Sequence, residues 1–251
     1  MRRIPTTHLT IPALRGSIER RFLINYRADP DVVRPHLPTG FEAHLVDGAC
    51  VVGICLIELR VRPTGLPASM GLRSFNGAHR YAVVDPGGRP SVYIPRRDTN
   101  STLGALVGGR LFPGSQSRAR IDAAEVNGGR TRVTLDSADG RVHVAVSGRP
   151  VGRLPAGSVF GGVVEASSFF EDADTGYSDT GRVDCLDAVT LRTTDWSVTP
   201  FEVDEATSSF FDDPDRFPPG SIALDHGLFM HDIDHAWQPL PRLALGSTTT
   251  G

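Results

Sequence analysis

Four side chains in this sequence are suited to general acid–base or oxyanion chemistry: Arg27, Glu58, Asn76 and His79. Glu58 lies in the apolar run 51–61, and the two-residue period of a strand places it on the same face as Ile54 and Leu56. If that face lines a cavity, the buried carboxyl group is a usable general acid or base. A structural ion pair with an arginine explains the same position equally well.

The other three residues offer binding and proton transfer. The Arg27 guanidinium can hold a carboxylate or enolate through two parallel hydrogen bonds. Asn76 can donate a hydrogen bond to an oxyanion, and His79 can move protons near neutral pH. Each has a structural alternative, because arginine is abundant in this chain and Asn and His often occupy turns and strand edges.

The densest group of ligand-like residues lies near the end of the chain, at His226, His231, Asp232, Asp234 and His235. His231 and His235 share one face only if this segment is helical. The alternation of apolar and polar residues favours a strand and a turn instead, and on a strand His226 and His231 point to opposite faces. We therefore predict no metal site and no cofactor, and keep metal-assisted chemistry at these histidines as an alternative.

The basic residues limit the chemistry further, since all 26 are arginine and no lysine occurs in the 251 residues. Apart from the N-terminal amine, the chain has no amine that can form an iminium with a carbonyl substrate. The net charge of −3 offers no basic footprint for nucleic acid or an anionic membrane. We expect the partner to be a small molecule, with no nucleic acid and no membrane.

The three cysteines, Cys50, Cys55 and Cys185, are odd in number and widely spaced, which fits neither a disulfide framework nor a zinc site. Residues 1–14 lack the apolar core of a signal peptide. No apolar run approaches the roughly 18 residues of a membrane span. A cytoplasmic location is the expectation.

Turn residues divide the chain into the short elements that must position these groups. Asp47-Gly48 and the segment 85–88 each separate two strand-like segments, which predicts two hairpins. Asp29 before Pro30 predicts the start of a short helix that ends near His36. Further helices are expected over residues 99–111 and 159–170 and a loop over 210–220. Strands are expected over residues 20–26, 41–46, 49–61, 81–84, 91–94, 118–126, 130–136, 141–147, 182–198 and 221–230.

The chain shows no repeat, no linker and no low-complexity block. These patterns predict a single domain over residues 1–251 that is mainly β (α+β). We expect one barrel-like antiparallel or mixed β domain with a few short helices.

Several motifs in a shared order resemble the acetoacetate decarboxylase superfamily, over roughly residues 18–240. The segment 22–29, Phe-Leu-Ile-Asn-Tyr-Arg-Ala-Asp, with the following Leu37-Pro38, is similar to the family's opening strand, capped helix and proline stop. Later resemblances are Gly109-Arg110, Phe112-Pro113, the segment 139–142 (Asp-Gly-Arg-Val) and the segment 224–228 (Leu-Asp-His-Gly-Leu). The segment 75–83 is also similar to related uncharacterised proteins of that superfamily. The resemblance implies the family's fold, its internal cavity and, as in many members, a homo-oligomer.

The resemblance also carries site residues onto this chain. The family's active-site arginine matches Arg27, and Tyr26, Phe112, Gly114, Ser115 and Gln116 correspond to positions that bind substrate. The two lysines that follow the family's aromatic-Pro pair are replaced by Gly114 and Ser115, and its acidic residue falls at Asn76, or at Gly77 if the register slips by one. Decarboxylation through a Schiff base is therefore excluded by composition.

The expected function is a cofactor-free enzyme of small-molecule or natural-product metabolism. It is expected to act on a carbonyl or keto-acid substrate by non-covalent acid–base chemistry, in a dehydration, cyclisation or isomerisation. Arg27 is expected to anchor the substrate, Glu58 to act as acid or base, and Asn76 or His79 to polarise the carbonyl. Two alternatives are a non-catalytic small-molecule binding protein and a lysine-independent decarboxylase.

Overall fold

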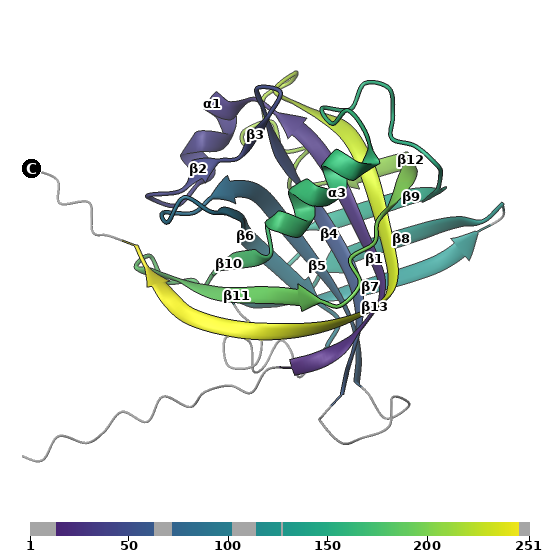
Figure 1. Cartoon of the computed structure of the whole chain (residues 1–251), viewed down its shortest axis with the longest axis horizontal. Helices are drawn as coiled ribbons and strands as arrows, with labels where there is room; N and C mark the ends of the chain where they lie inside the picture. Colours follow the sequence, from purple (N-terminus) through teal and green to yellow (C-terminus); the bar gives the residue numbers. More distant parts are fainter. Residues whose placement is uncertain (1–13, 63–71, 102–113, 127, 246–251) are drawn as a thin grey trace, which may run out of the picture.

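The computed structural model describes residues 14–62, 72–101, 114–126 and 128–245 (Figure 1). Strands dominate, and helical segments are short. The strands are β1 Leu14–Ala28, β2 Glu42–Ala43, β3 Leu45–Val46, β4 Ala49–Arg62, β5 Leu72–Val84, β6 Pro90–Thr99, β7 Gln116–Val126, β8 Arg130–Ser137, β9 His143–Pro150, β10 Thr175–Asp179, β11 Cys185–Thr193, β12 Thr199–Ser208 and β13 Ile222–Ala244. The helical segments are α1 Pro30–Val33, the 3₁₀ turn Arg34–His36 and α3 Val163–Asp172.

Local sequence signals explain the first elements. Asp29 caps α1 by accepting a hydrogen bond from the backbone N–H of Asp31, and Pro30 occupies the first turn. Asp47 and Gly48 both have positive φ, 49° and 76°, as the tight turn between β3 and β4 requires. The predicted capped helix and both early hairpins are confirmed.

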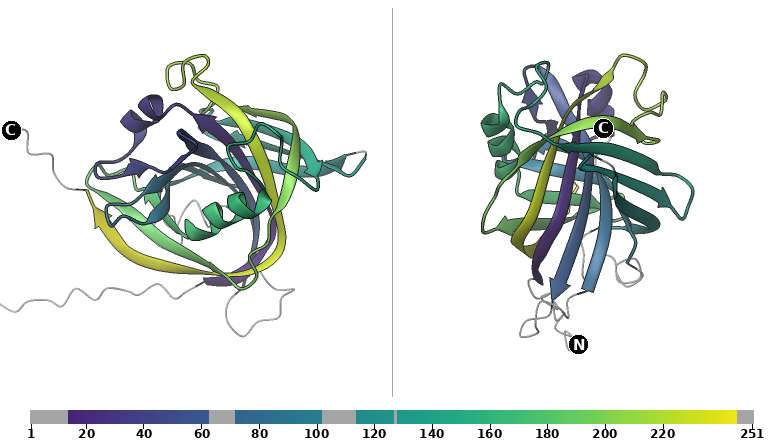
Figure 2. Two further views of the ribbon diagram at one scale, coloured as in Figure 1. Left: turned by 45° about the horizontal axis from the view of Figure 1, so that its top comes forward. Right: turned by 90° about the vertical axis from the view of Figure 1, so that its right-hand side faces the viewer.

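The strands form one mixed sheet that closes on itself. β6 pairs with both β5 and β10, and β11 pairs with both β10 and β13. β13, β1, β4, β5, β6, β10 and β11 therefore make a closed ring, and α3 lies across its opening (Figure 2, left). The remaining path from β6 through β7, β8, β9 and β12 returns to β13, so five strands are shared by the ring and this second half of the sheet. The predicted mainly β, barrel-like fold is confirmed.

The two faces of the shared strands bury separate apolar clusters. Inside the ring, Leu23, Ile57 and Met230 pack with Phe170 of α3. On the opposite face, alternate residues such as Phe22 and Leu56 pack with residues of β7, β8, β9 and β12. Where the shared strands lie between the two clusters they are buried on both faces, so side-chain parity decides which cluster a residue joins.

Some predicted element limits were wrong. Thr99 ends β6 instead of starting a helix, and the rest of the predicted helix 99–111 lies largely outside the described residues. α3 begins at Val163, four residues after the predicted start at Val159, because Ser158 and Val159 instead form hydrogen bonds with Asp225. β11 is shorter than the predicted strand 182–198, and β13 continues far beyond the predicted end at Met230.

Candidate functional site

A small chamber lies inside the ring and is covered by α3. Its volume is about 80 Å³, which suits a small metabolite, since one buried water needs roughly 10–15 Å³. All ring strands contribute to its wall. The lining residues are Arg21, Cys55, Ile57, Ala78, Arg80, Val92, Ile94, Arg97, Phe170, Ala173, Asp174, Gly176, Val189 and Trp237.

Strand register brings the polar lining residues together. Cys55 of β4, Ala78 of β5 and Arg97 of β6 are direct cross-strand partners in one row. Arg80 follows Ala78 by two residues and so points to the same face. Ile57 follows Cys55 by two residues, and its cross-strand partner Arg21 therefore lies on this face as well. The small Ala78 side chain leaves the space between these groups open.

The three arginines of the chamber have no carboxylate partner among the described residues. Arg21 donates its Nε–H to Cys55 Sγ at 3.4 Å and lies 5.9 Å from the Trp196 ring. Arg97 donates to Ser178 Oγ at 2.9 Å. Other arginines form ion pairs, as at Arg96 with Asp98 and Asp139. Uncompensated cations in an enclosed space are suited to binding an organic anion.

Burial affects two of these guanidinium groups. It lowers the pKa of Arg80 and of Arg97 to about 10, because the charged form loses hydration inside the ring. Both groups therefore remain cationic at neutral pH. Arg80 is 4% exposed, its Nε–H has no hydrogen-bond partner among the described residues, and the Phe170 ring lies 4.7 Å from its guanidinium carbon.

Asp174 is the one carboxylate among the described lining residues. It pairs with Arg192 at 2.9 Å and accepts a hydrogen bond from Thr175 Oγ1. His235 precedes the lining residue Trp237 by two positions and is 4% exposed, with neither ring nitrogen hydrogen-bonded in the described part of the chain. Burial, followed by the Arg21 charge, lowers the His235 pKa to about 4. His235 is therefore neutral at physiological pH.

Arg27 and Glu58 lie outside the chamber. Arg27 borders an open depression beside α1, donates to the Gly157 carbonyl at 2.6 Å and lies near Asp225. Glu58 shares its face with Leu56 as predicted, but Leu56 belongs to the apolar cluster outside the ring. The Glu58 carboxylate pairs with Arg20 at 2.8 Å and Arg73 at 3.0 Å, which is the structural alternative given above.

The other predicted polar residues are also dispersed. His79 is fully buried outside the ring, 3.1 Å from Ser208 Oγ and 4.5 Å from the Phe210 ring. Burial, with smaller effects from two arginines, lowers its pKa to about 3. Tyr26 packs at 5.1 Å against Phe211 on that same side. Asn76 is half-buried and donates to Ser74 Oγ at 3.1 Å, without lining the chamber.

Gly114, Ser115 and Gln116, which the resemblance predicted as substrate-binding positions, do not line the chamber but lie near its residue Arg97. Gly114, with φ of 82°, packs against Ser178, the hydrogen-bond partner of Arg97. Gln116 is the cross-strand partner of Arg97, and the exposed Ser115 donates its N–H to the Asp179 carbonyl. The structure thus brings Gly114, Ser115 and Gln116 together beside the chamber. Phe112 lies outside the described residues.

The predicted histidine cluster is divided. His226 is buried and bonds Asp225 at 2.6 Å, whereas His231 is exposed and bonds Asp232 at 3.0 Å. A positive φ at Asp232 changes the strand alternation between His231 and His235. Within the described ranges, no three His, Cys, Asp or Glu residues are grouped as metal ligands.

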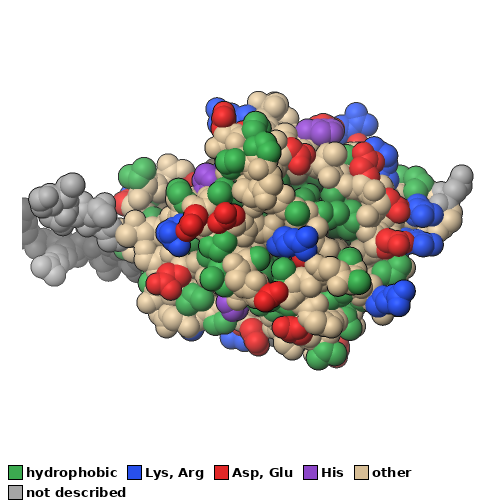
Figure 3. Space-filling model, turned by 90° about the horizontal axis from the view of Figure 1, so that it is seen from above, with side chains coloured by type: hydrophobic (Ala, Val, Ile, Leu, Met, Phe, Trp, Pro, Cys, Tyr) green, Lys and Arg blue, Asp and Glu red, His purple; other side chains and the backbone are tan. Residues whose placement is uncertain are grey.

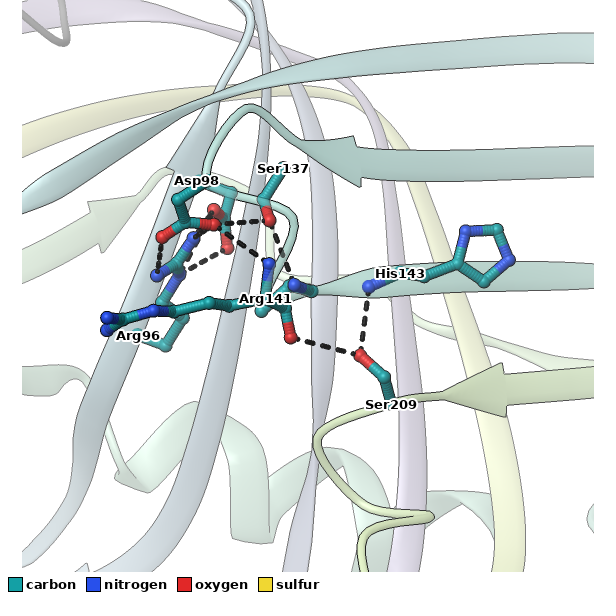
Figure 4. Close-up of polar contacts among 8 residues, drawn as sticks. Arg96, Asp98, Ser137, Arg141, His143 and Ser209 are labelled. Atoms are coloured by element: carbon teal, nitrogen blue, oxygen red, sulfur yellow. Dashed lines mark hydrogen bonds and ion pairs between the residues drawn. The ribbon is translucent and has the colours of Figure 1, made fainter.

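A second polar network joins β6 to the turn between β8 and β9 (Figure 4). Arg96 binds both Asp98 and Asp139, and Asp139 also accepts hydrogen bonds from Ser137 and the N–H of Arg141. These bonds hold the turn of the segment 139–142, which the resemblance had singled out. Since acids and arginines are paired here, the network stabilises the hairpin.

One face of the molecule carries charges of both signs. On the face seen from above, acidic and arginine side chains alternate without a field of one sign (Figure 3). No helix of the described residues is long and apolar enough to cross a membrane.

The chamber arginines were not predicted, although strand parity contained a signal. Arg80 lies on the same strand face as Ala78 and Ala82, and Arg21 lies on the same face as Leu23 and Asn25. A cation on the apolar face of a central strand requires an internal partner or a cavity. The sequence did not reveal which of the two buried faces encloses the cavity.

Comparison with protein families gives a match that covers most of the chain. The model of the DUF2071 family, described as an uncharacterised conserved protein, matches residues 17–214. The search of curated protein sequences found no match.

Solved structures resemble this chain at low sequence identity. The enduracididine biosynthesis enzyme MppR, in complex with pyruvate, is 16% identical over 96% of this chain and 93% of its own, with a TM-score of 0.61. An acetoacetate decarboxylase-like enzyme from Sphingomonas wittichii RW1 is 13% identical over 97% of this chain and 98% of its own, with a TM-score of 0.58. Acetoacetate decarboxylase from Legionella pneumophila is 12% identical over 96% and 92%, with a TM-score of 0.56. These values establish a shared fold, as the sequence motifs had indicated.

Proposed function

The chain belongs to the DUF2071 family and has the fold of acetoacetate decarboxylase, and on this premise we propose that it is an enzyme of small-molecule metabolism. Its substrate is a small carboxylate that carries a carbonyl group. The chamber arginines bind this anion, and the reaction proceeds without a Schiff base, as a lyase or isomerase reaction.

One observation carries the proposal: Arg21, Arg80 and Arg97 line one cavity, and none of them forms an ion pair with a described carboxylate, since the lining Asp174 is paired with Arg192. Arg80 is buried and Arg21 and Arg97 are half-buried, and gathering three such cations is unfavourable unless an anion compensates them. A carboxylate accepts two parallel hydrogen bonds from one guanidinium, and a second oxygen function of the ligand is available to the next. The small volume favours a ligand close in size to pyruvate, the molecule bound in the MppR structure.

The same cations supply a catalytic effect. Removing a proton or carbon dioxide next to a carbonyl group produces an enolate, whose oxygen carries a full negative charge. Guanidinium groups fixed near that oxygen stabilise the charge as it forms, and one such donor contributes about 10²–10³-fold in rate. Since the sequence contains no lysine, the substrate itself must act as the electron sink.

A non-catalytic binding protein is the second candidate function. The observation in its favour is the state of Asp174, whose carboxylate is already engaged by Arg192 and Thr175. Binding without turnover needs only the arginines.

Cys55 provides a direct test of the anion site, because its thiol lines the chamber. Iodoacetate and iodoacetamide alkylate thiols and differ in one negative charge. The rate ratio of iodoacetate to iodoacetamide at Cys55, measured by peptide mass spectrometry, is expected to exceed that of 2-mercaptoethanol in the same tube by about tenfold, the factor for one charge-assisted hydrogen bond. Excess pyruvate is expected to slow the reaction.

Two controls complete the test. Arg97→Gln removes one chamber cation and should lower the ratio, whereas Ser208→Ala alters a buried hydrogen bond on the other side of the sheet and should leave it unchanged. A ratio equal to that of 2-mercaptoethanol, or failure of Cys55 to react with either reagent, would overturn the proposal. Turnover of 2-oxo acids, followed by NMR, then distinguishes an enzyme from a binding protein.

A further inference from the structure

A buried chain of four side chains leads from the chamber to a carboxylate outside it. Arg80 Nη2 donates to Asn25 Oδ1, Asn25 Nδ2 lies 2.9 Å from His226 Nε2, and His226 Nδ1 lies 2.6 Å from Asp225 Oδ1. The exposed fractions of Arg80, Asn25, His226 and Asp225 are 4%, 0%, 1% and 6%. Three of these residues have no place in the proposed anion site, since only Arg80 lines the chamber.

The donor and acceptor roles in this hydrogen-bond chain follow from its two end groups, the Arg80 guanidinium and the Asp225 carboxylate. A guanidinium has no acceptor, so Asn25 must accept through Oδ1 and donate through Nδ2. The same amide orientation lets Asn25 Nδ2 donate to the Leu23 carbonyl at 3.3 Å. His226 Nε2 is then an acceptor, and its ring proton lies on Nδ1 and is donated to Asp225. His226 is thus a neutral tautomer with a single orientation.

The Asp225 carboxylate is held in place by two further hydrogen bonds. It accepts hydrogen bonds from Ser158 Oγ at 2.7 Å and from the N–H of Val159 at 3.0 Å. These bonds and that from His226 outweigh desolvation and lower the pKa of the Asp225 carboxyl group. The chain therefore ends in a carboxylate that stays charged at neutral pH.

We infer that Asn25 and His226 are positioning residues for Arg80, which they link to the charge of Asp225 while keeping that charge away from the chamber. A carboxylate placed directly against Arg80 would neutralise it and compete with the ligand. Two neutral side chains between them orient the guanidinium by one Nη and leave its Nε–H unpartnered among the described residues. This inference rests on the proposed anion site.

Asn25→Asp tests the inference with an isosteric change. It places a carboxylate against Arg80, so the iodoacetate-to-iodoacetamide ratio at Cys55 should fall about tenfold, the factor for losing one charge-assisted hydrogen bond. His226→Phe breaks the chain one step further from the chamber and should lower the ratio in the same direction. Iodoacetamide rates should remain unchanged in both variants, and Ser208→Ala serves as the control for an altered buried hydrogen bond.

The outcomes separate the inference from the proposed function. If wild-type protein shows no preference for iodoacetate, the proposed function fails. If wild type shows the preference and folded variants keep it, the inference alone is overturned. If both reagents react faster in the variants, the chain only seals the chamber, and the positioning role is again overturned.

A measurement on wild-type protein avoids any dependence on the folding of variants. Alkylation of Cys55 by the two reagents gives adducts that differ only in the charge of the group placed in the chamber. Because the chain couples Arg80 to His226, the ¹⁵N resonances of the His226 ring should differ between the two adducts, although His226 does not line the chamber. Identical His226 resonances would overturn the inference.

Discussion

Arg27 Nη1 lies 3.6 Å from Asp225 Oδ2, so the arginine predicted as a substrate anchor instead meets the outer end of the buried hydrogen-bond chain. The two side chains differ greatly in environment, since the side-chain atoms alone are 45% exposed in Arg27 and 1% exposed in Asp225. Two motifs that are far apart in the sequence therefore meet at the segment before α3, where Arg27 also binds Gly157.

The asymmetry of this pair predicts unequal effects on stability. Asp225→Ala leaves the buried His226 Nδ1–H and the half-buried donors of Ser158 and Val159 without their acceptor, and it is expected to lower the free energy of unfolding by about 3 kcal/mol. Arg27→Ala removes a largely solvated partner and should cost less than about 1 kcal/mol. Urea unfolding at pH 7 measures both values, and equal losses would contradict the described burial.

The free energy of unfolding is expected to decrease as the pH is lowered from 6.5 to 3, because His79 is buried in its neutral form. Its pKa is about 3 in the folded protein against 6.5 as the ordinary value. In this interval the unfolded chain binds a proton that the folded chain does not, so stability rises with pH by up to about 1.4 kcal/mol per unit. His235, with a pKa of about 4, acts in the same direction.

His79→Gln removes one of these titrating groups. The slope of unfolding free energy against pH, measured with urea at pH 6.5, 5.5 and 4.5, should therefore decrease in this variant. His143→Gln is the matched control, since His143 is exposed and bonds Asp136 at the surface. A slope that is unchanged by His79→Gln would argue against a buried neutral His79.

Gly114 is expected to resist substitution for two separable reasons. Its φ of 82° is unfavourable for other residues by about 1–2 kcal/mol, and a Cβ there would lie 2.5 Å from Ser178 Cβ. Gly140 has a comparable φ of 69° but open space around it. Gly114→Ala should therefore destabilise the protein by about 1–3 kcal/mol more than Gly140→Ala, as overpacking does.

The same contact bears on whether a lysine can be introduced here. A lysine at position 114 would displace Ser178, which holds Arg97. Gly114→Lys is expected to give no borohydride-trapped adduct with pyruvate on the introduced lysine, and the displacement of Ser178 and Arg97 should lower the preference of Cys55 for iodoacetate. Thermal unfolding measures the loss of stability at position 114, and intact mass spectrometry detects a trapped adduct.

The sequence predicted the fold from local signals that act within a few residues. Asp29-Pro30, Asp47-Gly48 and the segment 85–88 specify a cap and two turns whatever the rest of the chain does. The limits of β13 depended on long-range pairing, since its second half pairs with β11 and β1. Pairing between strands that are far apart in the sequence has no signal in the neighbouring residues, so the end of β13 could not be predicted.

The site was harder to predict because both faces of the central strands are buried. Parity placed Glu58 correctly with Leu56, but it could not say that Arg21 and Cys55 occupy the face toward the chamber. The resemblance located Gly114 next to the site, while the arginine it transferred to Arg27 lies outside. A motif match identifies residues along the sequence, whereas the strand pairing of the closed ring determines which side chains meet in the chamber.

Neutralising Arg80 should change the alkylation ratio at Cys55, whereas neutralising Glu58 should not. Glu58→Gln weakens pairs with Arg20 and the more exposed Arg73, so it should lower the free energy of unfolding by about 1 kcal/mol and leave the alkylation ratio at Cys55 unchanged. Arg80→Gln removes a chamber cation and should lower that ratio about tenfold. The lost cation–π contact with Phe170 should cost about 1–2 kcal/mol in stability. If Glu58→Gln lowers the ratio as much as Arg80→Gln, the carboxylate acts on the chamber, and the assignment of the site to the arginines is wrong.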